Sequence, residues 1–219
     1  MFIGKYDKSV IVTYLGTLSS MIGIYFILGG EIPRITGAII CLMIAGICDM
    51  FDGKVARMCK NRTEKDIQYG IQYGIQIDSL ADMVSFIVYP IIIFYGVTKA
   101  FDCNIYPFIS IPILTLFTVC GISRLAFFNI NTATEKTVEY YSGLPVTSTA
   151  MIFPLIYLLR YVLSPNIFVI VYFITFAIIA FLMVYNFKVK KFKANSFYVI
   201  CTILAIIMTA VLIILKVAH

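Results

Sequence analysis

The sequence predicts an all-α integral membrane protein. Of its 219 residues, 61% are hydrophobic and 13% are charged, and the mean hydropathy is +0.97. A soluble globular domain is typically about half apolar and about a quarter charged, so this composition argues against a water-soluble fold. The apolar residues also gather into seven runs, most of them near the roughly 20 residues that cross a bilayer as a helix.

The seven runs follow one another without a polar stretch long enough to form a separate soluble domain. In chain order they are Ser9–Leu28, Ile35–Asp49, Ile77–Val97, Ile105–Phe128, Val146–Leu163, Ile167–Phe187 and Phe197–Leu215. The lead-in MFIGKYDKSV lacks a small-residue cleavage site, so we interpret it as a juxtamembrane segment. The second run is short for a crossing, and we expect its helix to continue through Arg57. The connections EIPR, KAFDCN and RYVLSPN contain the turn-forming residues typical of helix ends.

The basic residues are distributed unevenly between alternate connections. With the N-terminus placed inside, thirteen of the seventeen Lys and Arg residues fall on that side and four on the other. The positive-inside rule then places the N-terminus and both aspartate-bearing segments in the cytoplasm, at the cell membrane. The basic run KVKKFK has two interpretations: it binds anionic headgroups, or it acts only as a topology signal.

Four aspartates stand out in this apolar sequence. Asp49 and Asp52 are three residues apart, and Asp78 and Asp82 are four apart, so each pair lies on one helix face. The first pair ends a helix that arrives at the cytoplasmic side, and the second pair begins the helix that leaves it. A charge in mid-membrane costs at least about 2.5–3.5 kcal/mol, so such residues usually have partners or a function. We expect all four carboxylates to converge on one site.

Divalent cations are the expected partners of these carboxylates. Close acidic groups repel one another unless cations enter, and hard oxygen ligands suit Mg²⁺, Mn²⁺ or Ca²⁺. Zinc is disfavoured, because the one histidine is His219 and the six cysteines show no CxxC pairing. A solvated acidic loop is the alternative interpretation.

Small residues and an arginine accompany the acidic pairs. Gly53, Ala56 and Gly74 allow a bulky ligand to approach the backbone, and the planar fork of Arg57 suits a phosphate. Together with bound metal ions, these features indicate a pyrophosphate site.

The two stretches DMFDGKVAR and GIQIDSLAD resemble the signature of the CDP-alcohol phosphatidyltransferase family. That signature is D-x-x-D-G-x-x-A-R, a connector, and G-x-x-x-D-x-x-x-D, and all eight fixed residues are present. The resemblance implies a core of six transmembrane helices, usually in a homodimer, with a polar cavity open to the cytoplasm. It also implies transfer of a phosphatidyl group from a CDP-lipid to an alcohol, with release of CMP.

The resemblance assigns a role to each matching position. It implies two bound divalent ions, Mg or Mn and possibly Ca. Their implied ligands are Asp49, Asp52, Asp78 and Asp82. Asp82 is also implied as the base that deprotonates the acceptor hydroxyl. The implied CDP-lipid site comprises Asp49, Asp52, Gly53, Ala56, Arg57, Gly74 and Asp78.

The chain departs from the family pattern in two places. The connector from Met58 to Tyr73 has sixteen residues, about twice the usual length. Its charged part, KNRTEKD, is expected to loop into the cytoplasm, and a repeated IQYG adds roughly one helical turn before Asp78. The seventh apolar run exceeds a six-helix core, so we expect a family domain at 1–190 and an additional transmembrane helix at 191–219.

The later stretches GISRLAFFNI and YYSGLP, like GIQIDSLADMVSF, are similar to the serine-using branch of the family. The expected substrates are therefore CDP-diacylglycerol and L-serine. Candidate acceptor-binding residues are Arg124, Asn129 and Lys136, with an interfacial anchor as the alternative role of Arg124. Glycerol 3-phosphate and inositol phosphate are the alternative acceptors. A cation transporter is disfavoured, because the acids gather at one membrane face without inverted repeats.

Overall fold

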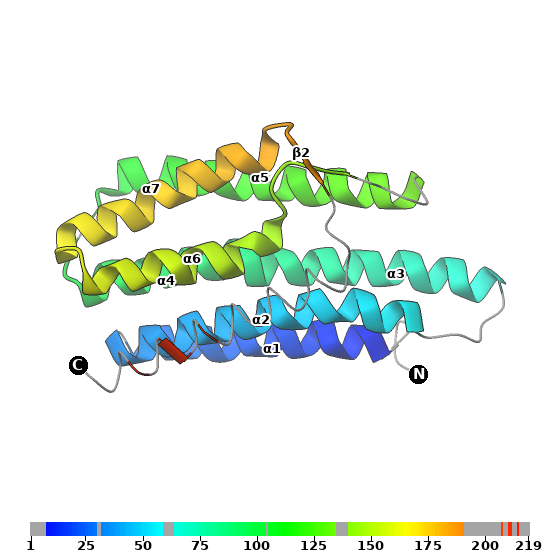
Figure 1. Cartoon of the computed structure of the whole chain (residues 1–219), viewed down its shortest axis with the longest axis horizontal. Coiled ribbons are helices and arrows are strands. Elements are labelled where there is room, and N and C mark those ends of the chain that lie inside the picture. Colours follow the sequence, from blue (N-terminus) through cyan, green and yellow to red (C-terminus); the bar gives the residue numbers. More distant parts are fainter. Residues whose placement is uncertain are drawn as a thin grey trace.

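The computed structural model describes residues 8–29, 32–58, 64–103, 105–134 and 140–190, and the single residues 207, 210, 211 and 214. Within these ranges the chain forms a bundle of long helices (Figure 1). The elements are α1 Lys8–Leu28, α2 Ile32–Met58, α3 Glu64–Asp82, η1 Met83–Val88, α4 Tyr89–Ala100, α5 Pro107–Thr134, β1 Tyr140–Ser142, η2 Val146–Ser148, α6 Thr149–Leu158, η3 Leu159–Tyr161, α7 Pro165–Val184 and β2 Lys188–Lys190.

Five of the described helical segments are long and apolar enough to cross a membrane, which fits a multi-pass membrane protein. They are Val10–Leu28, Arg34–Asp52, Gln72–Ala100, Pro107–Ile130 and Pro165–Val184, and Val146–Tyr161 is a shorter apolar segment. These six segments confirm the first six predicted runs and the all-α class. The seventh run, Phe197–Leu215, lies outside the described residues except for the four isolated positions.

The helix of the second run continues past Arg57 to Met58, as predicted. The next described helix, α3, begins at Glu64 and includes the repeated IQYG, so the repeat extends a helix. Glu64–Asp66 belong to the first turn of this helix and not to the loop that we expected. The end of α2 and the start of α3 lie at the same end of the bundle as the start of α1 (Figure 1).

A six-residue π-helical turn, η1, follows Asp82 directly and joins α3 to α4. The backbone N–H of Tyr89 donates to the carbonyl of Val84, five residues earlier. Proline has no N–H and its ring clashes with the carbonyl four residues before it, so Pro90 deprives the Phe86 carbonyl of its usual helical donor. The hydroxyl of Thr149, at the start of α6, donates to this carbonyl at 3.1 Å. The turn is therefore held from a second helix.

Close packing of α1 against α2 and α4 depends on glycine. A Cβ at Gly16 would lie 3.2 Å from the Cβ of Cys48, and a Cβ at Gly23 would overlap the hydroxyl of Tyr89. That hydroxyl donates to the Ala38 carbonyl of α2 at 2.5 Å. The small glycines of α1 thus let two neighbouring helices approach closely.

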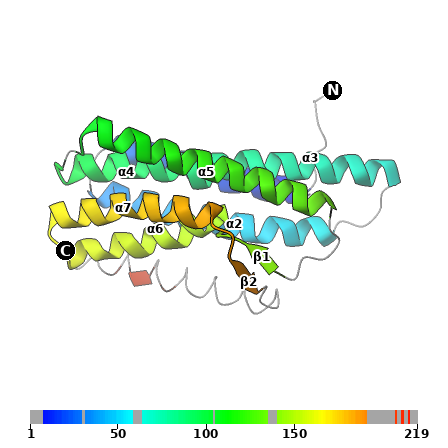
Figure 2. The ribbon, with the colours of Figure 1, turned by 90° about the horizontal axis from the view of Figure 1, so that it is seen from above.

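Aromatic rings fill the centre of the bundle between α4, α5, α6 and α7. The ring of Phe176 lies 4.5 Å from that of Phe153 and 5.0 Å from that of Phe117, centroid to centroid. Seen from above in Figure 2, α5 and α7 run along the molecule next to each other, which agrees with their packing contacts. This core keeps the second half of the chain against the aspartate-bearing helices.

A two-stranded antiparallel ribbon, which the sequence did not predict, joins the segment after α5 to the segment after α7. Tyr140 pairs with Lys190 and Ser142 with Lys188. The N–H of Gly143 donates to the Phe187 carbonyl, and that of Leu144 to the Leu182 carbonyl, at 2.9 and 3.0 Å. These bonds fasten the GLP segment, Gly143–Pro145, to the end of α7.

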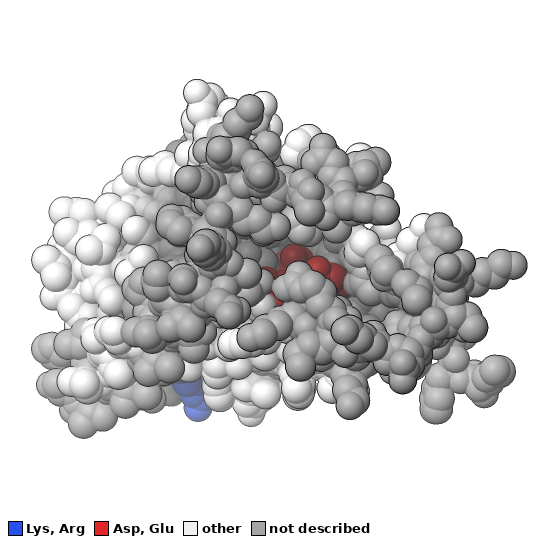
Figure 3. Space-filling model, turned by 45° about the vertical axis from the view of Figure 1, so that its right-hand side comes forward, with Lys and Arg blue, Asp and Glu red and all other residues white. Residues whose placement is uncertain are grey.

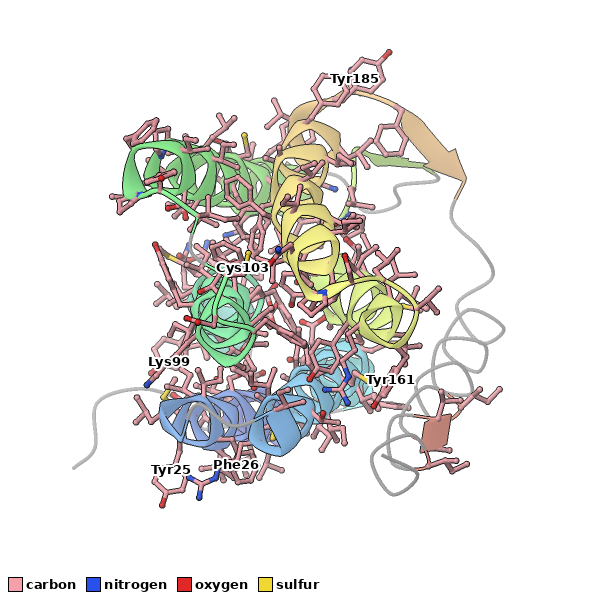
Figure 4. All side chains as sticks on the ribbon, turned by 90° about the vertical axis from the view of Figure 1, so that its left-hand side faces the viewer. Tyr25, Phe26, Lys99, Cys103, Tyr161 and Tyr185 are labelled. Carbon is pink, nitrogen blue, oxygen red and sulfur yellow. The ribbon has the colours of Figure 1, made fainter. Side chains whose placement is uncertain are left out.

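The opposite end of the bundle carries a second polar cluster, on the side that faces the viewer in Figure 4, where Tyr161 is labelled. The guanidinium of Arg160 lies 4.8 Å from the Tyr157 ring centre and 4.3 Å from that of Tyr161. Thr36 hydrogen-bonds the Tyr157 hydroxyl at 3.2 Å. At 1.5 Å per residue along α2, Thr36 is roughly 20 Å from Asp49, so this cluster is remote from the aspartates.

Candidate metal and nucleotide site

The aspartates of α2 and of α3 meet where these two helices approach each other. Asp49, Asp52 and Asp78 each offer a carboxylate oxygen, and these three oxygens lie within 4.8 Å of one another. The spacing of the residues on their helices turns each pair toward the other helix. The predicted convergence is confirmed for these three residues.

The fourth aspartate, Asp82, lines a small recess together with Asp49 and Asp52. The residues around the recess come from α1, α2, α3 and η1, and they are Thr13, Gly16, Ala45, Asp49, Asp52, Ala81, Asp82, Ser85 and Phe86. Figure 3 shows acidic atoms at the bottom of a depression in the molecular surface. All four sequence-predicted carboxylates thus belong to one place in the fold.

The carboxyl groups form two close pairs across the helix interface. Asp49 lies close to Asp82, and Asp52 lies close to Asp78. Asp52 and Asp82 are only 7% and 9% exposed. Carboxylates at such distances, and so far from water, repel one another unless a proton or a cation lies between them.

The donor set fits a divalent cation. The Oδ1 atom of Asp78 is buried without a hydrogen-bond partner among the described residues, although buried polar atoms are normally paired. Anionic oxygen atoms from three side chains within one ligand-sized space are what Mg²⁺, Mn²⁺ and Ca²⁺ prefer.

The sequence analysis missed three hydroxyl residues at or near the recess, and one of them, Thr13, contacts a carboxylate. The hydroxyl of Thr13 in α1 donates to Oδ2 of Asp52 at 2.7 Å, and the hydroxyls of Ser20 and Ser85 hydrogen-bond at 2.9 Å. A signal for them existed in the first apolar run, where Thr13, Gly16 and Ser20 recur at helical spacing on one face. Such a stripe indicates a helix interface, but it does not say which residues lie opposite.

The structure describes the surroundings of only some of the predicted nucleotide-binding residues. Gly53, Ala56 and Arg57 lie in the last turns of α2, and their side chains are outside the described part of the structure. Gly74 lies in α3, one turn before Asp78, and a Cβ built there would meet no atom within 4 Å among the described residues. Within the described part of the chain, the position of a Cβ at Gly74 is therefore open.

The predicted acceptor-binding positions have different environments. Arg124 in α5 is only 5% exposed, and its Nε donates to the Leu144 carbonyl of the GLP segment at 3.1 Å. Asn129, also in α5, accepts a hydrogen bond of 2.9 Å from Ser79, which adjoins Asp78. Lys136 lies outside the described residues. Arg124 is thus buried and hydrogen-bonded to the backbone, whereas an interfacial anchor would be exposed.

Comparison with known families bears on this geometry. Residues 9–178 match the family model of the CDP-alcohol phosphatidyltransferases, a region that includes all four aspartates. The chain belongs to the CDP-alcohol phosphatidyltransferase family. The match ends within α7, so it covers the described helical bundle and not the seventh apolar run.

Several curated relatives from this family are similar to the chain over part of its length. CDP-diacylglycerol–serine O-phosphatidyltransferase of Saccharomyces cerevisiae is 35% identical over 127 residues, 54% of this chain and 41% of that protein. Archaetidylserine synthase of Methanothermobacter thermautotrophicus is 31% identical over 66% of this chain and 56% of that protein. A CDP-diacylglycerol–serine O-phosphatidyltransferase of Helicobacter pylori is 34% identical over 52% and 42% of the two chains. The chain spans about half the length of these relatives.

Proposed function

We propose that the protein transfers the phosphatidyl group of CDP-diacylglycerol to the hydroxyl of L-serine and releases CMP. The observation that carries the proposal is the meeting of Asp49, Asp52 and Asp78, with Asp82 in the same recess, in a chain of this family. The choice of serine is supported by relatives whose names specify serine enzymes in yeast, Helicobacter and Bacillus.

In this proposal Asp49, Asp52 and Asp78 hold two divalent ions, Mg²⁺ or Mn²⁺, with a contribution from Asp82. Bound there, such ions would supply positive charge that balances the pyrophosphate and the departing CMP. The buried Oδ1 of Asp78 supports this assignment, because it has no hydrogen-bond partner in the described part of the chain and a cation would supply one.

Asp82 is the proposed base. It accepts the serine hydroxyl proton while the serine oxygen forms a bond to the lipid-bearing phosphorus. The phosphorus–oxygen bond to CMP breaks, and CMP leaves with the electron pair of that bond. Its position in the recess beside Asp49 supports this role, since a base must be within hydrogen-bonding reach of its proton donor. Direct attack predicts a sequential reaction without a covalent phosphatidyl-enzyme.

Gly53, Ala56, Arg57 and Gly74 form the proposed CDP side of the site, with Asp49, Asp52 and Asp78. The open space around Gly74 supports a close approach of the nucleotide. Arg57 would bind a phosphate through two parallel hydrogen bonds.

Serine presents a carboxylate, an ammonium and a hydroxyl to the acceptor side. Asn129 is the described acceptor candidate with a direct link to the acidic helix, through Ser79. We assign the serine carboxylate to this region, with Arg124 and Lys136 as its cationic partners. The bond from Arg124 to Leu144 would then also place the GLP segment beside the acceptor.

The proposal includes a membrane orientation and an assembly. The N-terminus and the recess face the cytoplasm, as the distribution of basic residues indicates. The family resemblance implies a homodimer. Residues 1–190 form the family domain, and residues 191–219 add a transmembrane helix.

The proposed function is tested by CMP release from CDP-diacylglycerol by the purified protein with Mn²⁺ or Mg²⁺. Serine, glycerol 3-phosphate and inositol phosphate are supplied separately. Release with serine alone, abolished by a chelator, is the expected result. Release with another acceptor would replace serine and keep the site. No release with any acceptor, in protein that binds the CDP-lipid, would contradict the proposed transfer.

A further inference from the structure

Helix α1 contributes a wall of the acidic recess although it contains none of the family signature. Thr13 lines the recess, and its hydroxyl donates to Oδ2 of Asp52 at 2.7 Å. Both side chains are buried, with 9% and 7% exposure. This contact joins residues 39 positions apart in the sequence.

The close approach of α1 to α2 is what brings this hydroxyl within reach of Asp52. Gly16, one turn after Thr13, faces Cys48 and Ala45 of α2, and a Cβ there would lie 3.2 Å from the Cβ of Cys48. Even alanine at this position would require Cys48 to shift by a few tenths of an ångström. Threonine is branched at Cβ and has few χ1 rotamers in a helix, so the donor is held in a narrow range of directions.

A fixed hydroxyl on one oxygen restrains the rotation of the Asp52 carboxylate. That orientation matters because one carboxylate oxygen of Asp52 lies within 4.8 Å of oxygens of Asp49 and Asp78, where the three could bind one ion. Residues that hydrogen-bond a metal ligand fix its direction, and their loss typically costs 10–100-fold in metal affinity or activity.

The same face of α1 also holds the other acidic helix. Ser20, two turns after Thr13, hydrogen-bonds Ser85 at 2.9 Å, and Ser85 follows Asp82 by three residues within η1. One helix therefore sets the register of both aspartate-bearing helices.

We propose that Thr13 is a positioning residue of the acidic site: its hydroxyl orients Asp52 for binding a divalent cation. This inference rests on the metal site of the proposed function. It does not depend on the acceptor alcohol or on the transfer reaction.

The test measures Mn²⁺ binding to the purified full chain in the absence of any substrate. Electron paramagnetic resonance detects the free Mn²⁺ that remains. Thr13→Val keeps the volume and removes the donor, whereas Thr13→Ser keeps the donor. Thr175→Val is the matched control, because Thr175 is a buried threonine of α7 whose hydroxyl donates to the Val171 carbonyl of its own helix. Thermal unfolding of each variant shows whether it is folded.

We expect Thr13→Val to weaken Mn²⁺ binding about 10–100-fold. Thr13→Ser and Thr175→Val should bind Mn²⁺ like the wild type.

Equal affinity of the wild type and a folded Thr13→Val would overturn the inference and leave the proposed transfer intact. If Thr13→Val does not fold, weak binding by a folded Thr13→Ser would overturn it as well. A wild type without Mn²⁺ binding would overturn the metal site and this inference together, whereas binding without CMP release would overturn only the transfer reaction.

Discussion

The hydroxyl of Thr149 donates to the backbone carbonyl of Phe86 at 3.1 Å, across the interface between α6 and the π-helical turn. Both residues are almost completely buried, and Pro90 supplies no N–H for this carbonyl. Because the turn begins directly after Asp82, the bond anchors the backbone next to the proposed base.

Thr149→Val should lower the free energy of unfolding by about 1–3 kcal/mol, since it leaves a buried carbonyl unpaired. Thr149→Ser, which keeps the donor, should lose less. Thermal unfolding in detergent measures the difference between the two variants. A loss in Thr149→Ser as large as that in Thr149→Val would contradict the predicted contribution of the hydrogen bond.

Gly23 and Gly74 should respond oppositely to substitution by alanine. Gly23→Ala places a Cβ against the Tyr89 hydroxyl in the core, and overpacking of this kind typically costs about 1–3 kcal/mol. Gly74→Ala meets no described atom within 4 Å and should leave the unfolding temperature unchanged while it weakens CDP-lipid binding. Unfolding curves and CDP-lipid titrations measure the two effects. Unchanged CDP-lipid binding by Gly74→Ala would remove Gly74 from the nucleotide site.

The hydropathy pattern predicted the five long apolar helices and the shorter apolar segment Val146–Tyr161, because burial in lipid requires apolar helices whatever their neighbours are. The spacing of the aspartates predicted their meeting, since helical periodicity alone puts each pair on one face. The contact of Thr13 with Asp52 depends on how α1 packs against α2. The contact of Thr149 with Phe86 joins residues 63 positions apart. Pairings between distant residues of this kind leave no periodic signal in one sequence.

The short ribbon and the burial of Arg124 were beyond prediction for the same reason. Tyr140 and Lys190 are separated by α6 and α7, so their pairing follows from the packing of the bundle. Arg124 resembles an interfacial arginine in sequence, yet the GLP segment folds over it and takes its Nε as a donor.

Asp49→Asn and Asp78→Asn should each reduce Mn²⁺ affinity by more than the roughly 10–100-fold expected for a residue that only supports a ligand. Each removes an anionic oxygen from the cluster in which three side chains meet. CMP release should fall in parallel. Asp102→Asn is the matched control, because Asp102 is exposed in the turn after α4. Wild-type Mn²⁺ affinity in both cluster variants would show that the aspartates do not hold the ion.

The most direct test of the proposed site compares the wild type with Asp82→Asn in CMP release from CDP-diacylglycerol with serine. The substitution keeps the shape of the side chain and removes the base, so release should fall about 10²–10⁴-fold, the usual contribution of general-base catalysis. Binding of the CDP-lipid should be retained, as measured in the same preparation. Release at the wild-type rate by Asp82→Asn would contradict the assignment of Asp82 as the base.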